Sequence, residues 1–508
     1  MSFKFPDIKV PKAVEYVIYA IFIAVYLWFK FSYHELWKDE WQAWLMARDM
    51  GWGELAGALY YEGHPGLWYF YLKIWALFSS GANDPLLLQM AHALVMVGVY
   101  WFIFFKLKIP FWVKILLLLS YYPFFEYGMV SRGYAFVMLI GFALVTLIDK
   151  PKENWKWLAG LFFLFCQTEV YAVMMAGALI FYLLLENGKA LFQDSKLRNI
   201  AVGAFAGLIV FIISVYPRGS AEELSRAYLS EPFSGEILSK GFQGMFANTF
   251  WIGSISDTNV FGVSNLGLFL SVIVLISLVF FFWKAKNLLW TLLFFVIGYF
   301  VFLVTIYTGG VRQWGTFFLF FVMLMHLYFS KAALIHGTTL SRATKVNTSG
   351  STAPSSLTTL SNVFPLLFLA SIFFFQIRYT SLAVQKEYRH PFSNSELAAN
   401  FIKEKVPENV PVVAINKFEA APVVGYANRK FYALPDGEQF SYFKWVEKIY
   451  LPSEQELKLF AEFKNVGGIV VITPKQLDKR RYPTAQLWKS FDNYNIKNEN
   501  YYLYSLQK

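Results

Sequence analysis

Residues 14–44 read VEYVIYAIFIAVYLWFKFSYHELWKDEWQAW, an apolar run that leads into an acidic pair. The run from Val14 to Phe31 is long enough to cross a bilayer, since a spanning helix needs about 20 mostly apolar residues. Lysines precede it and no small-residue cleavage site is present, so we expect a retained helix rather than a signal peptide. Asp39 and Glu40 follow closely. The stretch predicts a membrane protein with titratable groups just beyond its first span.

The whole chain shares this apolar character. Of 508 residues, 57% are hydrophobic and 16% are charged, and a soluble globule has no interior large enough for so many apolar runs. We expect a mainly α, polytopic membrane protein with about 11 transmembrane helices. The expected spans are residues 14–33, 86–105, 111–126, 132–148, 156–168, 170–185, 199–216, 263–283, 288–308, 313–330 and 358–377. The net charge of +11 comes mostly from lysines between these spans, so we expect no nucleic-acid partner.

The orientation depends on one aromatic segment, Leu67 to Phe78. It is shorter than the roughly 17 residues that a helix needs to cross the membrane directly, so we interpret it as an interfacial helix in the first outer loop, residues 34–85. The lysine-rich loops then fall on the side of the N-terminus, which the positive-inside rule places in the cytoplasm. We expect a multi-pass protein of the plasma (inner) membrane.

The same count of crossings gathers polar residues at the outer face. They are Asp39, Glu40, Glu62, His64, Glu126, Arg132, Glu169, Arg218 and Arg312. Residues 155–185 would make a helix too long for one straight crossing, and Gln167-Thr168-Glu169 interrupts them. We predict two helices that meet at this polar break. The break would line a cavity, because irregular backbone at membrane depth needs protein or water around it.

Composition divides the chain into two domains. The first is 1–380, which holds the spans, a long outer loop at 217–262 and a Ser/Thr/Gly-rich cytoplasmic linker at 331–357. The second is 381–508, where apolar runs at 412–415 and 468–472 are typical of buried strands and are flanked by amphipathic stretches. We expect this second part to be a small soluble α/β domain on the extracytoplasmic side.

Three segments resemble motifs of the GT-C superfamily of integral-membrane glycosyltransferases, which includes protein O-mannosyltransferases and aminoarabinose transferases acting on lipid A. They are Asp39-Glu40, Glu62-Gly63-His64-Pro65-Gly66-Leu67-Trp68-Tyr69 and Ser131-Arg132-Gly133-Tyr134-Ala135. The resemblance covers about residues 1–190 and the plan of a multispan core with an outer C-terminal domain. It implies a polyprenyl-phosphate-linked sugar as the donor.

Asp39 is the candidate base of such a transfer. The acceptor hydroxyl or amine needs a base within hydrogen-bond reach and in line with the anomeric carbon, because the attack inverts that carbon. Glu40 is the candidate orienting or metal-adjacent partner, since adjacent carboxylates rarely point at the same atom. Alternatively, the two acids form a solvated loop pair or a helix cap.

Glu62 and His64 are candidate ligands of a divalent metal ion, Mg, Mn or Zn, or of the donor phosphate, together with an acid of the first loop. The alternative is that His64 only fixes the turn before Pro65. GT-C enzymes differ in metal use, so the resemblance leaves this cofactor open.

Outer-face arginines are candidates for binding the donor phosphate, because a guanidinium holds phosphate through two parallel hydrogen bonds. Arg132 and Arg312 come first, and Arg218 is the third candidate. A structural pair such as Arg132 with Glu126, or a cation at a lipid headgroup, is the alternative. Glu169, at the polar break, is expected to contact sugar hydroxyls or to hold one of these arginines, and an internal ion pair is the alternative.

We therefore expect an inverting membrane glycosyltransferase that acts on a glycan, lipid or protein acceptor. The alternative is a transporter or flippase for a lipid-linked solute. Transporters usually show internal repeats and place ionisable groups near the bilayer midplane. Here polar groups gather at one face and no repeat is visible, which favours the enzyme.

Overall fold

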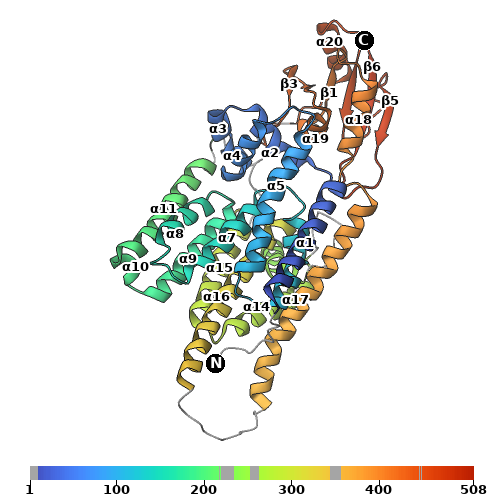
Figure 1. Ribbon diagram of the computed structural model, residues 1–508. Helices are drawn as coiled ribbons and strands as arrows, with labels where there is room; N and C mark the ends of the chain where they lie inside the picture. The colour runs from blue at the N-terminus through green and yellow to red at the C-terminus, as the bar shows by residue number, and fades with distance from the viewer. Residues whose placement is uncertain are drawn as a thin grey trace.

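The computed structural model describes residues 10–216, 218, 234–251, 263–343, 356–445, 447 and 449–508. Its larger part is a bundle of helices (Figure 1). Eight helices among these residues are long and apolar enough to cross a membrane. They are α1 (Lys12–Tyr33), α5 (Asp84–Trp101) continued by η1 (Phe102–Lys106), α9 (Val170–Asn187), α11 (Ser195–Val215), α14 (Asn265–Phe282), α15 (Lys286–Thr305), Val311–Lys331 within α16 (Val311–Ala343) and Val363–Arg389 within α17 (Ser356–Arg389). The mainly α, polytopic architecture is confirmed.

The other expected spans are shorter helices. Residues 111–126 form α6 (Phe111–Leu118) and a π-helical turn, η2 (Tyr122–Glu126). Pro123 has no N–H for a helical hydrogen bond, which fits the interruption of regular winding at this point. The next two helices are α7 (Tyr134–Ile148) and α8 (Trp155–Phe165), and α10 (Ala190–Gln193) joins α9 to α11.

The polar break predicted inside residues 155–185 is confirmed. Gln167-Thr168-Glu169 lies between the end of α8 and the start of α9. The backbone N–H of Leu67 donates to the carbonyl of Gln167 at 3.1 Å, so the break packs against the first outer loop. That loop folds into α2 (Lys38–Asp49), α3 (Trp52–Glu62) and α4 (Leu67–Ala76). With ten residues, α4 is only about 15 Å long, too short to cross a bilayer.

Two segments that were expected to be irregular contain helices. In the outer loop 217–262, α13 (Gly235–Gln243) is followed by η3 (Gly244–Asn248), while residues 217, 219–233 and 252–262 lie outside the described residues. The linker expected at 331–357 is helical at both ends, because α16 continues to Ala343 and α17 begins at Ser356. Residues 344–355 of this linker also lie outside the described residues.

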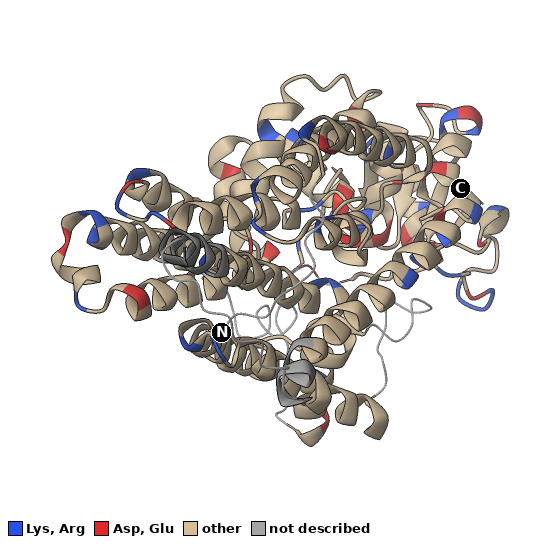
Figure 2. Cartoon of the chain, turned by 60° about the horizontal axis from the view of Figure 1, so that its bottom comes forward, with Lys and Arg blue, Asp and Glu red and all other residues tan. Residues whose placement is uncertain are grey.

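The lysine-bearing loops contact one another on the side of the bundle away from the C-terminal domain (Figure 1). Lys108 pairs with Asp149 at 2.6 Å, and Lys152 pairs with Asp194 at 2.7 Å. Lys331 forms an ion pair with Glu186. Figure 2 shows that charged residues in this part of the chain lie mainly at helix ends and loops. These contacts agree with the predicted alternation of spans and loops.

After α17 the chain forms an α/β domain. The helix continues past residue 381 to Arg389, so the domain begins later than its composition predicts. Its sheet has the order β3-β2-β1-β4-β6-β5, with β2, β1 and β4 parallel. The elements are α18 (Ser395–Lys405), β1 (Val412–Ala414), α19 (Lys417–Ala427), β2 (Phe431–Ala433), β3 (Glu438–Phe440), α20 (Glu454–Phe463), β4 (Gly468–Thr473), β5 (Gln486–Phe491) and β6 (Tyr501–Gln507). The two runs predicted as buried strands are β1 and β4.

The C-terminal domain packs directly onto the first outer loop (Figure 1). One apolar cluster contains Trp41 and Trp44 of α2 together with Val423 and Val424 of α19. A Cβ atom added to Gly425 would lie 2.2 Å from the Trp41 ring. The two helices therefore approach so closely that only glycine fits at this position.

Replacing Gly425 by alanine is expected to reduce the free energy of unfolding by about 1–3 kcal/mol, because the added methyl group overpacks the contact with Trp41. The control is Gly57→Ala in α3, where nothing lies within 4 Å of the added Cβ and alanine should stabilise the helix by up to about 1 kcal/mol. Thermal unfolding in detergent measures both. Equal effects of the two substitutions would contradict the close contact.

Candidate active site

Asp39 lies between two arginines at the junction of the helical bundle and the first outer loop. It is the second residue of α2, and its Oδ2 is 2.8 Å from Arg132 Nη1 and 3.5 Å from Arg312 Nη1. Arg132 comes from the turn before α7, and Arg312 is the second residue of α16. The side chains of Asp39, Arg132 and Arg312 keep 19%, 14% and 10% of their surface exposed, so each is partly open to solvent.

The pairing continues on both sides of Asp39. Arg312 Nε donates to Glu126 Oε1 at 2.7 Å. Arg132 Nη2 is 3.4 Å from His64 Nε2, and His64 Nδ1 is 2.8 Å from Glu169 Oε2. Because a guanidinium only donates, His64 accepts at Nε2 and donates from Nδ1. Six of the nine residues predicted at the outer face thus form one continuous network.

Two pairings in this network were not predicted in detail. Glu126 pairs with Arg312, not with Arg132, and Glu169 pairs with His64 and not with an arginine. Burial alone would raise the pKa of Asp39, but Arg132 and Arg312 lower it below its ordinary value. The Arg312 guanidinium also lies over the Trp37 ring, 5.1 Å from its centroid. Asp39 is therefore an ionised carboxylate held by two cations.

Glu40 faces away from Asp39 and is fully buried. Its Oε1 accepts from the Ser131 backbone N–H at 2.5 Å and is 3.2 Å from His34 Nε2, and its Oε2 accepts from the Trp37 backbone N–H at 3.2 Å. Burial would raise the pKa of Glu40, but these partners, His34 foremost, lower it to about 2. No surface of Glu40 is open to a substrate, which agrees with an orienting role and not with direct contact with a substrate.

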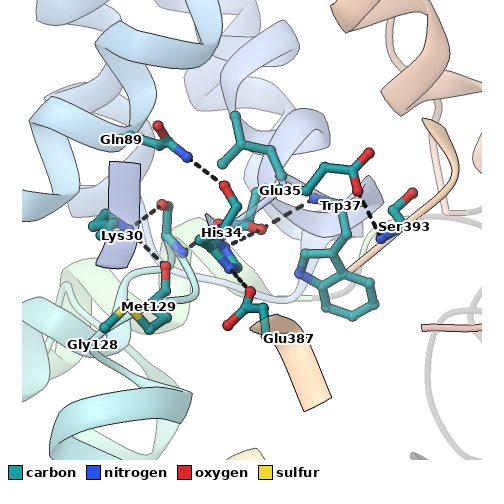
Figure 3. Close-up of polar contacts among 12 residues, drawn as sticks. Lys30, His34, Glu35, Trp37, Gln89, Gly128, Met129, Glu387 and Ser393 are labelled. Atoms are coloured by element: carbon teal, nitrogen blue, oxygen red, sulfur yellow. Dashed lines mark hydrogen bonds and ion pairs between the residues drawn. The ribbon is translucent and has the colours of Figure 1, made fainter. Parts of the chain in front are cut away.

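A second set of buried polar groups supports Glu40 (Figure 3). His34 Nδ1 is 2.6 Å from Glu387 Oε1, and Gln89 donates to the His34 carbonyl at 2.7 Å. Lys30 donates to the Met129 carbonyl at 2.6 Å and to Ser131 Oγ at 3.2 Å. The network ties α1, α2 and α17 to the turn that carries Arg132. The sequence offered one signal for it, since Lys30 is an ionisable residue inside the first apolar helix.

The metal ligation expected of Glu62 and His64 is not supported by their contacts. Glu62 is buried and accepts from Gln42 Nε2 and Tyr69 Oη, both at 3.1 Å, while His64 contacts Glu169 and Arg132. In the described ranges, no three His, Cys, Asp or Glu side chains are grouped as metal ligands. The metal ion therefore stays a prediction, and among the described residues Glu62 and His64 already have other hydrogen-bond partners.

Arg218 does not join the network. It lies just beyond α11 with an exposed side chain, and its guanidinium donates to the carbonyl of Ile213 at 2.9 Å. Its predicted contact with the donor phosphate therefore has no support in the structure.

No family model and no curated protein matches this sequence. The fold, however, is similar to that of ArnT from Cupriavidus metallidurans. The crystal structure of ArnT bound to undecaprenyl phosphate superimposes with a TM-score of 0.56 and 12% sequence identity, covering 97% of each chain. The apo structure gives a TM-score of 0.55 and 13% identity, covering 97% of this chain and 98% of ArnT. The chain is therefore a multi-pass membrane protein with a fold like that of ArnT.

Proposed function

We propose that this protein is a membrane glycosyltransferase that moves a sugar from a polyprenyl-phosphate donor to an extracytoplasmic acceptor, with inversion at the anomeric carbon. The observation that carries the proposal is the position of Asp39 between Arg132 and Arg312. The site lies in a fold similar to that of ArnT, which binds undecaprenyl phosphate in one of its structures. A carboxylate beside two guanidinium groups supplies both a base and a phosphate site.

In the proposed reaction, an acceptor oxygen or nitrogen forms a bond to the anomeric carbon while the bond from that carbon to the phosphate oxygen breaks. The bonding electron pair leaves with the lipid phosphate, and the proton of the acceptor moves to Asp39. Arg132 and Arg312 bind the phosphate oxygens and stabilise the negative charge that develops on them.

Donor binding would also prepare the base. While both arginines hold Asp39, its lowered pKa makes it a weak proton acceptor. The donor phosphate competes for the same guanidinium groups. As they turn to the phosphate, Asp39 loses the charges that lower its pKa and becomes a stronger base for the acceptor. The base is thus activated only when the donor is present.

We propose that the protein lies in the plasma (inner) membrane. Its N-terminus then faces the cytoplasm. The support is the contact of the lysine-bearing loops on one side of the bundle, together with the positive-inside rule. The network around Asp39 and the C-terminal domain then face outward, where that domain would help to bind a glycan, lipid or protein acceptor.

The function is tested by incubating the protein in closed proteoliposomes with a panel of radiolabelled polyprenyl-phosphate sugars and candidate acceptors. Transfer of label that depends on the protein supports the proposal. Movement of intact donor across the bilayer without any transfer would favour the transporter or flippase instead.

Replacing Arg132 by glutamine is expected to weaken the binding of undecaprenyl phosphate by about 10- to 100-fold, because a charge-assisted bidentate contact is lost. The matched control is Arg218→Gln, which removes an exposed arginine outside the network and should leave affinity unchanged. Titration of each variant with the lipid in nanodiscs measures the effect. Similar losses in both variants would mean that the lipid responds to overall charge and not to this site.

A further inference from the structure

The loop between β5 and β6, residues 492–500, reaches from the C-terminal domain to the end of α17. The backbone N–H of Ile496 donates to the carbonyl of Pro391, and that of Lys497 donates to the carbonyl of Phe392, both at 3.1 Å. These two bonds attach the tip of the loop to the segment that follows the last membrane helix. The loop is therefore anchored at the level of the candidate active site.

Asparagine side chains fix the internal shape of this loop. Asn394 Nδ2 donates to the carbonyls of Phe491 at 3.0 Å and Asn493 at 3.1 Å. Asn495 Oδ1 accepts from the backbone N–H of Glu499 at 2.9 Å, and Asn498 adopts a positive φ of 54° that closes the turn. Such a bonded loop holds the side chain at position 497 in a defined direction.

That direction leads to the Asp39 network. Lys497 Nζ lies over the Trp37 ring at 4.3 Å from its centroid, and Arg312 Cζ lies over the same ring at 5.1 Å. The lysine also lies over Phe392 at 5.1 Å. Within the part of the chain that the structure describes, no carboxylate lies within ion-pair distance of Nζ and no hydrogen bond to it is formed.

The electrostatic surroundings of Lys497 agree with this position. Burial lowers the pKa of its ammonium group and Arg312 lowers it further, whereas Glu126, Asp39 and Glu499 raise it. The half-buried ammonium is therefore close enough to the network to respond to its charges, yet it has no counter-ion of its own there. A phosphate beside this ammonium group would supply the ion-pair partner that no described carboxylate provides at contact distance.

The negative charge of the donor phosphate grows during the proposed reaction. Arg132, Arg312 and Lys497 are the cations near Asp39 and Glu126, while Glu169 pairs with His64. A sugar phosphodiester brings one negative charge. When the sugar leaves, the lipid phosphate becomes a monoester with a charge of about −1.5 to −2. A third cation therefore stabilises the product phosphate more strongly than it stabilises the donor.

We propose that Lys497 binds the phosphate of the lipid donor together with Arg132 and Arg312, so that the C-terminal domain completes the donor site. This inference rests on the proposed function. It assigns to the C-terminal domain a contact with the leaving phosphate, in addition to acceptor binding. Lys497 would contact the phosphate from the side of the Trp37 ring. It belongs to the C-terminal domain, whereas Arg132 and Arg312 belong to the helical bundle.

The test is the affinity of the full-length protein in nanodiscs for undecaprenyl phosphate and for undecaprenol, which lacks the phosphate. Lys497→Gln is expected to weaken undecaprenyl phosphate binding by about tenfold or more and to leave undecaprenol binding unchanged. Lys497→Arg should retain most of the affinity, because it keeps the charge. Lys489→Gln on β5 is the matched control, since it removes an exposed lysine from the same hairpin.

The outcomes separate the two proposals. If wild type prefers the phosphate-bearing lipid and Lys497→Gln binds it as tightly as Lys489→Gln does, the role of Lys497 is refuted while the donor class stands. If wild type binds both lipids equally, the donor class itself fails and the role of Lys497 fails with it. Unfolding temperatures of the variants establish that each one is folded when its affinity is measured.

Discussion

Replacing Asp39 by asparagine is expected to reduce sugar transfer by about 10²- to 10⁴-fold, the usual contribution of a general base. Asparagine has nearly the same size but cannot accept the proton of the acceptor. Because the substitution also removes the carboxylate that competes for Arg132 and Arg312, undecaprenyl phosphate should bind as tightly as before or more tightly. A loss of rate without a loss of donor affinity is the signature of this arrangement.

The matched control for this variant is Asp49→Asn at the other end of α2. Asp49 has nearly the same exposure, 18%, and is also paired with an arginine, Arg48, at 2.7 Å. It lies outside the network, so its substitution should leave transfer unchanged. Single-turnover transfer from a radiolabelled donor gives the rate, and lipid titration gives the affinity. If Asp39→Asn transfers as fast as Asp49→Asn, Asp39 is not the base.

Replacing Glu40 by glutamine is expected to lower the free energy of unfolding by about 3–5 kcal/mol, because removing one member of a buried ionic network leaves its partners unpaired. Glu40 is buried and contacts His34, Ser131 and Trp37. Chemical unfolding in detergent measures the change. The control is Glu153→Gln, which affects an exposed pair with Lys150 and should change stability by less than about 1 kcal/mol.

The same network predicts how stability depends on pH. The two carboxylates beside His34 raise its pKa to about 9, against the effect of burial, so its contribution is complete below pH 6.5 and is lost as pH rises through 9. The pKa of Glu40, about 2, is below its ordinary 4.5, so its contribution is lost only as pH falls from 4.5 toward 2. In the Glu40→Gln variant, the decrease in the free energy of unfolding between pH 6.5 and 9 should be smaller than in the wild type. An unchanged alkaline loss would mean that His34 does not titrate with this network.

Several parts of the site could be predicted because they follow from counting spans. Counting the membrane crossings predicted that Asp39, Arg132 and Arg312 lie at the same end of the bundle. In the structure, Asp39 pairs directly with both arginines. The break at Gln167-Thr168-Glu169 followed from the length of the apolar run. Strands β1 and β4 were visible because buried parallel strands are continuously apolar.

Other parts depend on contacts between distant segments, which one sequence does not reveal. Successive residues of a helix point about 100° apart, so the sequence already implied that Asp39 and Glu40 contact different partners. That Glu40 faces inward depends on His34 and, through it, on Glu387 near the end of α17. Lys497 reaches the site only because the C-terminal domain docks on α2. The outer strand β5 carries mostly exposed residues and therefore lacks an apolar signal.

The most direct test of the account is an experimental structure of the protein in nanodiscs with undecaprenyl phosphate. The account predicts that the phosphate contacts Arg132 and Arg312 and that Asp39 no longer pairs with both arginines. A phosphate bound elsewhere, with the pairs of Asp39 to Arg132 and Arg312 intact, would contradict the assignment of this network as the donor site.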